Sequence, residues 1–324
     1  MRILITGAAG FIGSNLAHWL IDNTGHEVYG IDNLSTGYIS NYPDSERFLY
    51  IHADICDERT LNDFFQGHLF DICFSFAAYA AEGRSNHIRS FIHHNNTVGT
   101  ANIINACLNY KCKLVFTSSV AVYSGEPPFD ENTIPNPIDE YGLSKWASER
   151  SIQIAGEQGL DWCIVRPRNV YGERQSLWDS ARNVAGIFIN QILNNEPITI
   201  FGNGSNRRCF TYIGDILEPL YNAAFIPKEI INLGSPLPHT IFELYQLLQK
   251  ITGYSKVEFL EERHEVKEAY CNTLTSEILL NYKHKTSLEE GLTKMWRWAK
   301  QQPKRQMETP PPLEINIKSH SSIK

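Results

Sequence analysis

Short apolar runs that alternate with longer amphipathic stretches are the feature that most constrains the fold of this chain. Four helical patterns, at 11–22, 61–65, 90–108 and 142–158, lie among the apolar runs. Chains that alternate in this way form parallel sheets, and strands apolar on both sides are buried on both faces. The pattern therefore predicts an α/β fold with a doubly wound parallel sheet. The predicted strands are Ile3–Thr6, Glu27–Ile31, Phe48–Ile51, Asp71–Ser75, Lys113–Thr117 and Asp161–Val165.

The regular alternation of strand and helix patterns ends at about residue 166, and loops rich in Asn, Gly and Pro follow. We expect residues 1–165 to form the sheet domain, interleaved with later segments. Residues 166–302 are expected to form mainly a smaller, mixed α/β lobe that packs against the sheet. Residues 303–324 contain Pro310–Pro312 and a polar Ser/Lys ending, which predicts a disordered tail.

Composition and charge exclude several classes of protein. A net charge of −7 argues against a nucleic-acid-binding surface. The seven cysteines are odd in number and include no C-x-x-C pair, which favours reduced thiols and a cytoplasmic location. No signal peptide fits the first residues, and no apolar stretch approaches the roughly 20 residues of a membrane span. We therefore expect a cytoplasmic protein that neither enters a membrane nor binds nucleic acid.

A glycine-rich turn follows the first predicted strand and opens the first predicted helix. Its glycines are Gly7, Gly10 and Gly13. The first permits the tight bend, the second lets the backbone approach a pyrophosphate, and the third lets helix and strand pack closely. A phosphate would lie at the helix N-terminus, where free N–H groups point. The turn predicts a Rossmann dinucleotide-binding domain, with Phe11 and Ile12 beside the cofactor.

The end of the second predicted strand favours one dinucleotide. Asp32 lies nineteen residues after Gly13, where a carboxylate would accept hydrogen bonds from an adenosine ribose. Asn33 follows it in place of an arginine that could pair with a 2′-phosphate, so NAD is favoured over NADP. Residues after the third and fourth strands could also contact the cofactor, although ordinary packing explains them equally well. These residues are Asp54, Ile55, Phe76, Ala77 and Ala78.

A tyrosine and a lysine at helical spacing are the candidate catalytic pair. Tyr141 and Lys145 are four residues apart at the start of a predicted helix, which places both on one face, roughly 6 Å apart along the axis. A neighbouring ammonium favours the phenolate form of a tyrosine, whose reference pKa is about 10. Ser119 follows the fifth predicted strand and could hydrogen-bond a substrate oxygen while Tyr141 takes its proton.

Together these motifs resemble the extended short-chain dehydrogenase/reductase superfamily, in particular its NAD-dependent sugar-nucleotide epimerases and dehydratases. The resemblance covers residues 1 to about 301. It implies a tightly bound NAD that oxidises one sugar carbon to a ketone, with Asn95 and Arg168 beside the cofactor. It also implies a homodimer formed through the helices at 90–108 and 142–158. It rests on Gly7, Gly10, Gly13, Asp32, Asp54–Ile55, Asn95–Asn96, Ser119, Tyr141, Lys145, 166–172, 201–208, 210–215 and Arg263.

Residues that the chain lacks distinguish among the reactions of this family. The dehydratases carry an Asp–Glu pair directly after the catalytic hydroxyl residue, but here Ser119 is followed by Val120 and Ala121. The 3,5-epimerases use a cysteine and a lysine, and the matching positions are Ala121 and Val184. Neither apolar side chain can move a proton. The resemblance therefore implies a UDP-hexose 4-epimerase, which removes hydride at C4 and returns it to the other face without a metal.

The resemblance also implies how the nucleotide sugar is held. Asn169 would contact the diphosphate, and Arg208 and Arg263 would pair with its oxygens as charge-assisted donors. Tyr270 matches the position that limits the room around the sugar, which favours a plain hexose over an N-acetylated one. The roles of other polar residues stay open; Arg84 or Arg182 could hold a uronic acid. Those residues are Glu82, Arg84, His87, Arg174 and Arg182.

Other functions remain possible at this point. A GDP- or UDP-sugar reductase would consume and release its cofactor, and an epimerase could act on UDP-glucuronate or on a UDP-N-acetylhexosamine. A protein that only senses NAD would be expected to lose the Tyr141/Lys145 pair, which this chain retains.

Overall fold

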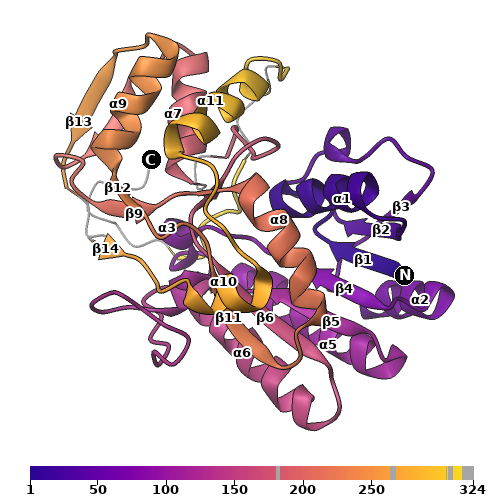
Figure 1. Cartoon of the computed structure of the whole chain (residues 1–324). Helices are drawn as coiled ribbons and strands as arrows, with labels where there is room; N and C mark the ends of the chain where they lie inside the picture. The colour runs from indigo at the N-terminus through magenta and orange to yellow at the C-terminus, as the bar shows by residue number, and fades with distance from the viewer. Residues whose placement is uncertain (180–182, 263–267, 304, 306–308, 316–324) are drawn as a thin grey trace.

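A seven-stranded parallel sheet forms the centre of the molecule (Figure 1). The computed structural model describes residues 1–179, 183–262, 268–303, 305 and 309–315. The strands follow the order β11-β6-β5-β4-β1-β2-β3, and every neighbouring pair is parallel. Order reverses between β1 and β4, where a doubly wound sheet binds its ligand. The strands are β1 (Arg2–Thr6), β2 (Glu27–Asp32), β3 (Phe48–His52), β4 (Ile72–Ser75), β5 (Lys113–Thr117), β6 (Trp162–Pro167) and β11 (Glu229–Leu233).

Both faces of the sheet are covered by helices, which confirms the predicted α/β class. Alternate residues of a strand point to opposite faces, so Ile3 and Ile5 join one core and Leu4 joins another. The first core lies under α1 (Phe11–Asn23) and α8 (Ile213–Asn222); the second lies under α2 (Glu58–His68), α5 (Gly99–Tyr110) and α6 (Glu140–Glu157). All six predicted strands are present within one or two residues of their expected ends.

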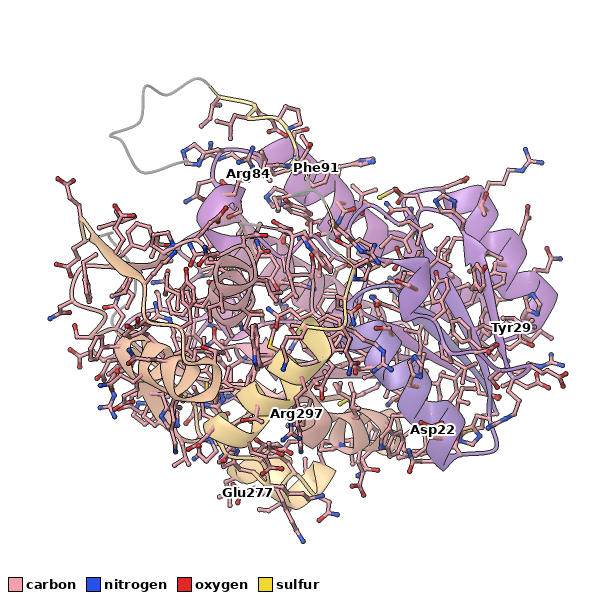
Figure 2. All side chains as sticks on the ribbon, turned by 90° about the horizontal axis from the view of Figure 1, so that it is seen from above. Asp22, Tyr29, Arg84, Phe91, Glu277 and Arg297 are labelled. Atoms are coloured by element: carbon pink, nitrogen blue, oxygen red, sulfur yellow. The ribbon has the colours of Figure 1, made fainter. Side chains whose placement is uncertain are left out.

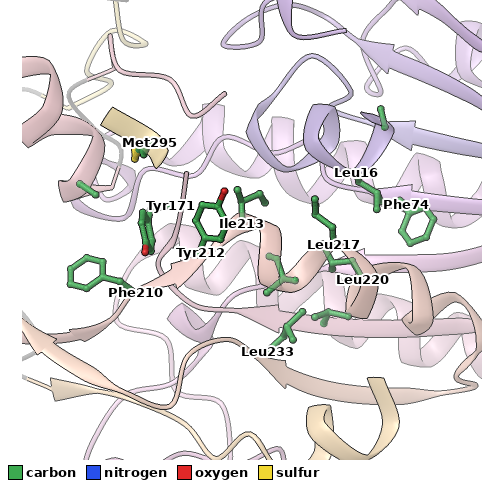
Figure 3. Packing of buried hydrophobic residues seen from close by; sticks show 14 of the residues in the cluster. Leu16, Phe74, Tyr171, Phe210, Tyr212, Ile213, Leu217, Leu220, Leu233 and Met295 are labelled. Carbon is green, nitrogen blue, oxygen red and sulfur yellow. The ribbon is translucent and has the colours of Figure 1, made fainter. Parts of the chain in front are cut away.

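The later part of the chain supplies both a lobe and the seventh strand. α8 packs against α1, and β11 pairs with β6, so both belong to the sheet layers. Figure 3 shows Leu217 and Leu220 of α8 near Leu16 and Phe74, and the same core continues through Phe210 and Tyr212 into the lobe. α3 (Glu82–Ser85) contacts α6, and α10 (Leu274–Leu280) contacts α8 and β11. The lobe is built from the other later elements. These are β7 (Val170–Tyr171), α7 (Val184–Leu193), β8 (Ile198–Phe201), β9 (Arg207–Cys209), β10 (Thr211–Tyr212), β12 (Pro238–Thr240), α9 (Ile241–Thr252), β13 (Val257–Leu260), β14 (Glu268–Ala269) and α11 (Leu288–Ala299).

The predicted helix at 90–108 is continuous but not uniform. It begins as α4 (Arg89–Ile92), widens into the π-helical η2 (His93–Val98) and continues as α5. Wide turns of this kind are frequent at functional sites. Here the turn contains Asn95 and Asn96, two of the residues on which the family resemblance rests. In the described part of the chain, no helix has the length and apolar character needed to cross a membrane.

The structure corrects the prediction of a disordered tail for the described residues after 302. The Arg305 guanidinium lies over the Tyr38 ring, 3.8 Å from its centroid. The Glu314 carboxylate accepts the backbone N–H groups of Ser90 and Phe91, both at 2.8 Å. Figure 2 shows this segment beside Arg84 and Phe91. The carboxylate satisfies N–H groups in the first turn of the long helix, which have no partner within the helix itself.

Candidate active site

The first two turns of α6 hold the predicted tyrosine and lysine. The Asp139 carboxylate caps this helix by accepting the Gly142 N–H at 2.7 Å. Tyr141 and Lys145 are both buried. The Lys145 ammonium donates to the Thr117 carbonyl at 2.7 Å, at the end of β5, and lies over the Phe116 ring. Burial lowers the pKa of Lys145 to about 8, and the carboxylate of Glu149 partly opposes that shift.

Ser119 lies on a short turn that meets the start of α6. It is the N-cap of η3 (Val120–Val122), and its Oγ accepts the Ala121 N–H at 3.1 Å. The helix can approach this turn because position 142 is glycine: a Cβ atom there would lie 2.3 Å from the Ala121 carbonyl oxygen. The chain thus brings the segments that carry Ser119, Tyr141 and Lys145 together at the carboxyl end of β5. The three residues remain our candidates for catalysis.

The glycine-rich turn packs closely against neighbouring backbone because its glycines carry no side chains. Gly7 has a φ of +70°, which favours glycine, and a Cβ atom there would lie 2.8 Å from the Ala77 nitrogen. A Cβ atom on Gly13 would lie 2.2 Å from the Gly7 carbonyl oxygen, and one on Gly10 would lie 3.1 Å from the same atom. Phe11 and Ile12 begin α1 at this turn. The first helix therefore starts directly against the end of β1.

Asp32 at the end of β2 is held in place by backbone N–H groups. Its two carboxylate oxygens accept from Ala9 at 2.9 Å and from Leu34 at 2.7 Å. Burial raises the pKa of Asp32, and these hydrogen bonds act against that shift. The Ala9 contact fixes the carboxylate against the glycine-rich turn, where a ribose contact is predicted.

The residues after β3 make a polar contact and an apolar one within the chain, and their predicted contact with the cofactor stays a prediction. Asn33 donates to the Asp54 carboxylate at 2.9 Å, and the Cys56 N–H donates to it at 2.8 Å. Burial opposes ionisation of Asp54, but the hydrogen bonds from Cys56 and Asn33, together with the charge of His94, outweigh it and hold the pKa of Asp54 below its ordinary value. Ile55 is buried against Gly99, where a Cβ atom would lie 2.6 Å from its side chain. Core packing therefore explains much of the Ile55 side chain.

The residues after β4 lie beside the glycine-rich turn. The Ala77 N–H donates to the Thr6 hydroxyl at 3.1 Å, and the Phe76 N–H donates to the Thr6 carbonyl. Ala78 follows directly. In η2, the Asn95 amide donates to Asn96 at 2.9 Å; Asn96 in turn holds the backbone of Tyr79 and donates to Ser144 on α6.

Three buried hydroxyl groups near the strand ends were not singled out from the sequence. Ser75 ends β4, Thr117 ends β5, and Ser118 follows it; none of these hydroxyl oxygens has a hydrogen-bond partner within the described residues. Buried polar groups without a partner are rare, so these oxygens fit a bound polar ligand at this edge. The sequence does contain a pattern that could have identified them, because each is a small hydroxyl residue at the end of an apolar strand. With the glycine-rich turn and Asp32, they make the edge fit a dinucleotide.

The predicted substrate residues come from several later segments. Asn169 has a φ of +36° in the turn between β6 and β7, and its carbonyl accepts the Thr211 N–H. Arg168 is buried and donates to the carbonyls of Cys271 and Gly234, so those two contacts already use its terminal nitrogens. Arg208 lies on β9, the middle strand of a three-stranded sheet.

The structure also shows the contacts of Tyr270 and of the polar residues whose roles the sequence left open. Tyr270 is half-buried, and its carbonyl accepts the Phe129 N–H at 3.0 Å. Arg84 donates to the Pro311 carbonyl at 2.7 Å, the Glu314 N–H donates to the His87 carbonyl, and Arg174 donates to Asn15 at 3.0 Å. Glu82 begins α3. Arg182 and Arg263 lie outside the described residues. Within the part that the structure describes, no group of three or more His, Cys, Asp and Glu side chains could hold a metal ion.

Comparison with known families decides the class of the chain. The model of the NAD dependent epimerase/dehydratase family matches residues 3–234. The chain belongs to this family. The match confirms the predicted resemblance and NAD as the cofactor, and it spans the glycine-rich turn, Ser119, Tyr141 and Lys145.

Several relatives of this NAD-dependent epimerase/dehydratase chain are similar over nearly its whole length. A UDP-glucuronate 4-epimerase of Thermodesulfobacterium geofontis is 31% identical over 92% of this chain and 96% of its own. The structure of a Thermotoga maritima UDP-glucose 4-epimerase with UDP-glucose matches with a TM-score of 0.88 and 30% identity. A Bacillus cereus UDP-glucuronic acid 4-epimerase, with UDP-glucuronic acid and NAD, matches with a TM-score of 0.85 and 30% identity. Each of these two structures covers 93% of this chain and 99% of the other.

Proposed function

We propose that this chain inverts C4 of a UDP-hexose, interconverting UDP-glucose and UDP-galactose through a transient 4-keto sugar. The observation that carries the proposal is the set of side chains at the end of β5. Tyr141, Lys145 and Ser119 stand there, and η3, which follows Ser119 directly, contains only Val120, Ala121 and Val122. Epimerisation at C4 needs one base for one hydroxyl proton, and Tyr141 supplies it. Dehydration would need a further acid and base at the positions of Val120 and Ala121.

Each catalytic candidate has one task in this reaction. Bound NAD would accept hydride from C4 of the sugar and return it. Tyr141 takes the proton of the C4 hydroxyl and later gives it back, while Ser119 hydrogen-bonds the same oxygen. Lys145, whose pKa of about 8 leaves it largely protonated at neutral pH, favours the phenolate form of Tyr141 by its charge. Burial of both side chains strengthens this effect, because water screens buried charges less.

The nucleotide diphosphate would be held by the lobe. Asn169 projects from the turn after β6 and Arg208 from β9, and we assign the diphosphate to these two residues together with Arg263. Tyr270 adjoins the buried group that contains Phe129 and Cys271 and would limit the space around the sugar. This arrangement favours a hexose without an N-acetyl group.

A UDP-glucuronate 4-epimerase is the second candidate. The specific observation in its favour is the similarity to two proteins of that name, at 30% and 31% identity. Arg84 stays a candidate for holding a uronic acid, because its contact with the Pro311 carbonyl uses one terminal nitrogen and its buried Nε has no partner among the described residues.

A substrate panel separates the two candidates. The purified protein, without added cofactor, is incubated with UDP-galactose, UDP-glucuronate and UDP-N-acetylgalactosamine, and inversion at C4 is followed by proton NMR. We expect UDP-galactose to turn over fastest and the Tyr270→Cys variant to gain activity on the N-acetylated sugar. Preferred turnover of UDP-glucuronate would replace the first candidate by the second.

The role of Tyr141 has its own control. Tyr141→Phe should abolish turnover while the protein still carries NAD, and Tyr50→Phe, at an exposed tyrosine on β3, should change neither. Turnover by Tyr141→Phe at the wild-type rate would remove this residue from the mechanism.

We also propose a homodimer through the outer surfaces of α5, η2 and α6. Val98 is 44% exposed and Ile154 is 51% exposed, and Leu143 is also exposed on α6. Large apolar side chains gathered on neighbouring helices are typical of protein–protein interfaces.

A further inference from the structure

A buried charged pair lies one helical turn beyond Lys145. Residues 141, 145 and 149 of α6 are four apart, so Glu149 continues the face that carries Tyr141 and Lys145. Glu149 is 1% exposed and Arg166, at the end of β6, is 2% exposed. The Arg166 Nε donates to one carboxylate oxygen of Glu149 at 2.8 Å, and its Nη2 donates to the other at 2.5 Å. Such a two-pronged contact fixes the direction of both groups.

The third donor of Arg166 reaches the segment that carries Ser119. Its Nη1 donates to the Tyr123 hydroxyl, which can donate to the Asp130 carbonyl at 2.9 Å or to Asn232 at 3.1 Å. Tyr123 follows η3 directly, and its N–H donates to the Val120 carbonyl within the turn that Ser119 begins. One guanidinium thus contacts both the helix of Tyr141 and the turn of Ser119.

The surroundings of Lys145 make Glu149 its dominant charged neighbour among the described residues. The end of β5 offers the Phe116 ring and the Thr117 carbonyl, which carry no charge. The wide turn η2 faces α6 through Asn96 and Ser144, also uncharged. The ionisable His93 of η2 and Arg89 of α4 pair with Glu140, at the first residue of α6.

The ionisation of Arg166 and of Lys145 follows from these contacts. Burial acts against the charge of Arg166, but the hydrogen bonds and charge of Glu149, together with Tyr123, outweigh burial and hold the pKa of Arg166 above its ordinary value. Glu149 in turn raises the pKa of Lys145 against the larger effect of burial. Glu149 is bound to Arg166 through both carboxylate oxygens, while the Lys145 ammonium donates to the Thr117 carbonyl.

We infer that Glu149 and Arg166 are positioning residues for the catalytic group: Glu149 maintains the charge of Lys145, and Arg166 limits that influence while tying α6 to the Ser119 turn through Tyr123. The inference rests on the proposed function for its catalytic meaning. The placement of the charges, however, can be measured without any substrate.

The first test measures the ionisation of Lys145 in the NAD-loaded protein. Protein labelled with carbon-13 at the lysine Cε is titrated by NMR, and the Lys145 signal is identified by its loss in Lys145→Met. We expect Glu149→Gln to lower the titration midpoint of Lys145. Arg166→Lys should raise it, because a lysine keeps the charge but loses the paired contact with both Glu149 oxygens and leaves Glu149 more influence on Lys145. Glu157→Gln and Arg150→Lys, at exposed positions of α6, should leave the midpoint unchanged.

The second test separates the charge from the tether. Tyr123→Phe removes one contact of Arg166 without changing any charge, so it should leave the Lys145 midpoint in place. It should lower kcat for UDP-galactose by about tenfold through looser placement of Ser119, with KM little changed.

The Lys145 titration and the kcat measurement test different parts of the inference. A Lys145 midpoint that does not move in either Glu149→Gln or Arg166→Lys would overturn the inference, even if both variants are less stable. An unchanged kcat in Tyr123→Phe would refute the claim that Arg166 ties α6 to the Ser119 turn through Tyr123. If no nucleotide sugar turns over in the wild-type protein, the proposed function fails, but the titration still decides the role of the pair.

Discussion

Replacing Gly142 by alanine tests whether the close approach of α6 to the Ser119 turn sets the geometry of the site. The added Cβ atom would lie 2.3 Å from the Ala121 carbonyl oxygen and 3.0 Å from the Pro137 side chain. Ordinary van der Waals contact begins at 3.4 Å, so the helix and the turn must separate by about 1 Å. A displacement of that size at a catalytic group can cost about 100-fold in rate.

The same substitution should have a small effect on stability. Alanine is favoured over glycine inside a helix by about 1 kcal/mol, and overpacking costs about 1–3 kcal/mol. The two terms oppose each other, so the free energy of unfolding should change by no more than about 2 kcal/mol. The expected signature is therefore a large fall in kcat with only a modest shift in Tm.

The assay compares Gly142→Ala with a matched variant. UDP-galactose turnover and thermal unfolding are measured for NAD-loaded Gly142→Ala and for Gly67→Ala on α2, where a Cβ atom would have no neighbour within 4 Å. Gly67→Ala should keep full activity. A Gly142→Ala protein that retains kcat within threefold of wild type would refute the idea that this contact positions Tyr141 against Ser119.

Three further perturbations test other parts of the structure. Lys145 has a pKa of about 8 in the folded protein against 10.5 in the unfolded chain, so the folded protein binds fewer protons between these pH values and gains stability as pH rises through them. Lys145→Met should lose this gain when thermal unfolding is measured across that pH range. The same pH dependence of stability in Lys145→Met and wild type would contradict the low pKa. Glu314→Ala removes the carboxylate that accepts the N–H groups of Ser90 and Phe91. The substitution should lower the free energy of unfolding by about 1 kcal/mol and speed hydrogen exchange in the first turn of α4. Unchanged exchange would show that the contact does not stabilise this turn. Ile154→Glu should turn the proposed dimer into a monomer in light scattering, and an unchanged mass would place any interface elsewhere.

Local patterns in the sequence predicted most of the sheet and its glycine-rich turn. The strands from Arg2–Thr6 to Trp162–Pro167 are short apolar runs, and their order follows from the alternation with helices. The last sheet strand, Glu229–Leu233, was not recognised, because it follows the lobe segments in the sequence and pairs with a strand more than 60 residues earlier. For the described residues of the predicted tail the reason is similar: proline and serine content predicts disorder, whereas Glu314 has its partners 223 and 224 residues away.

Side chains whose roles depend on distant backbone were the hardest to predict. Arg168 was expected beside the cofactor, but its terminal nitrogens contact carbonyls of Gly234 and Cys271, which are 66 and 103 residues distant in sequence. Its cofactor role stays a prediction. The buried hydroxyls of Ser75 and Thr117 escaped notice because a single serine or threonine at a strand end is common. Only the assembled sheet shows that they share one edge.

The docked C-terminal segment has a consequence for how the protein is made. The long helix that starts at Arg89 emerges early in translation, whereas its carboxylate cap arrives only with Glu314. Until then, the beginning of this helix and the loop at Arg84 and His87 lack their last partners. During synthesis the sheet can therefore be complete before the start of α4 and the loop at Arg84 and His87 gain their contacts with the final residues. A fusion that displaces residues 309–315 would leave the mature protein without these contacts.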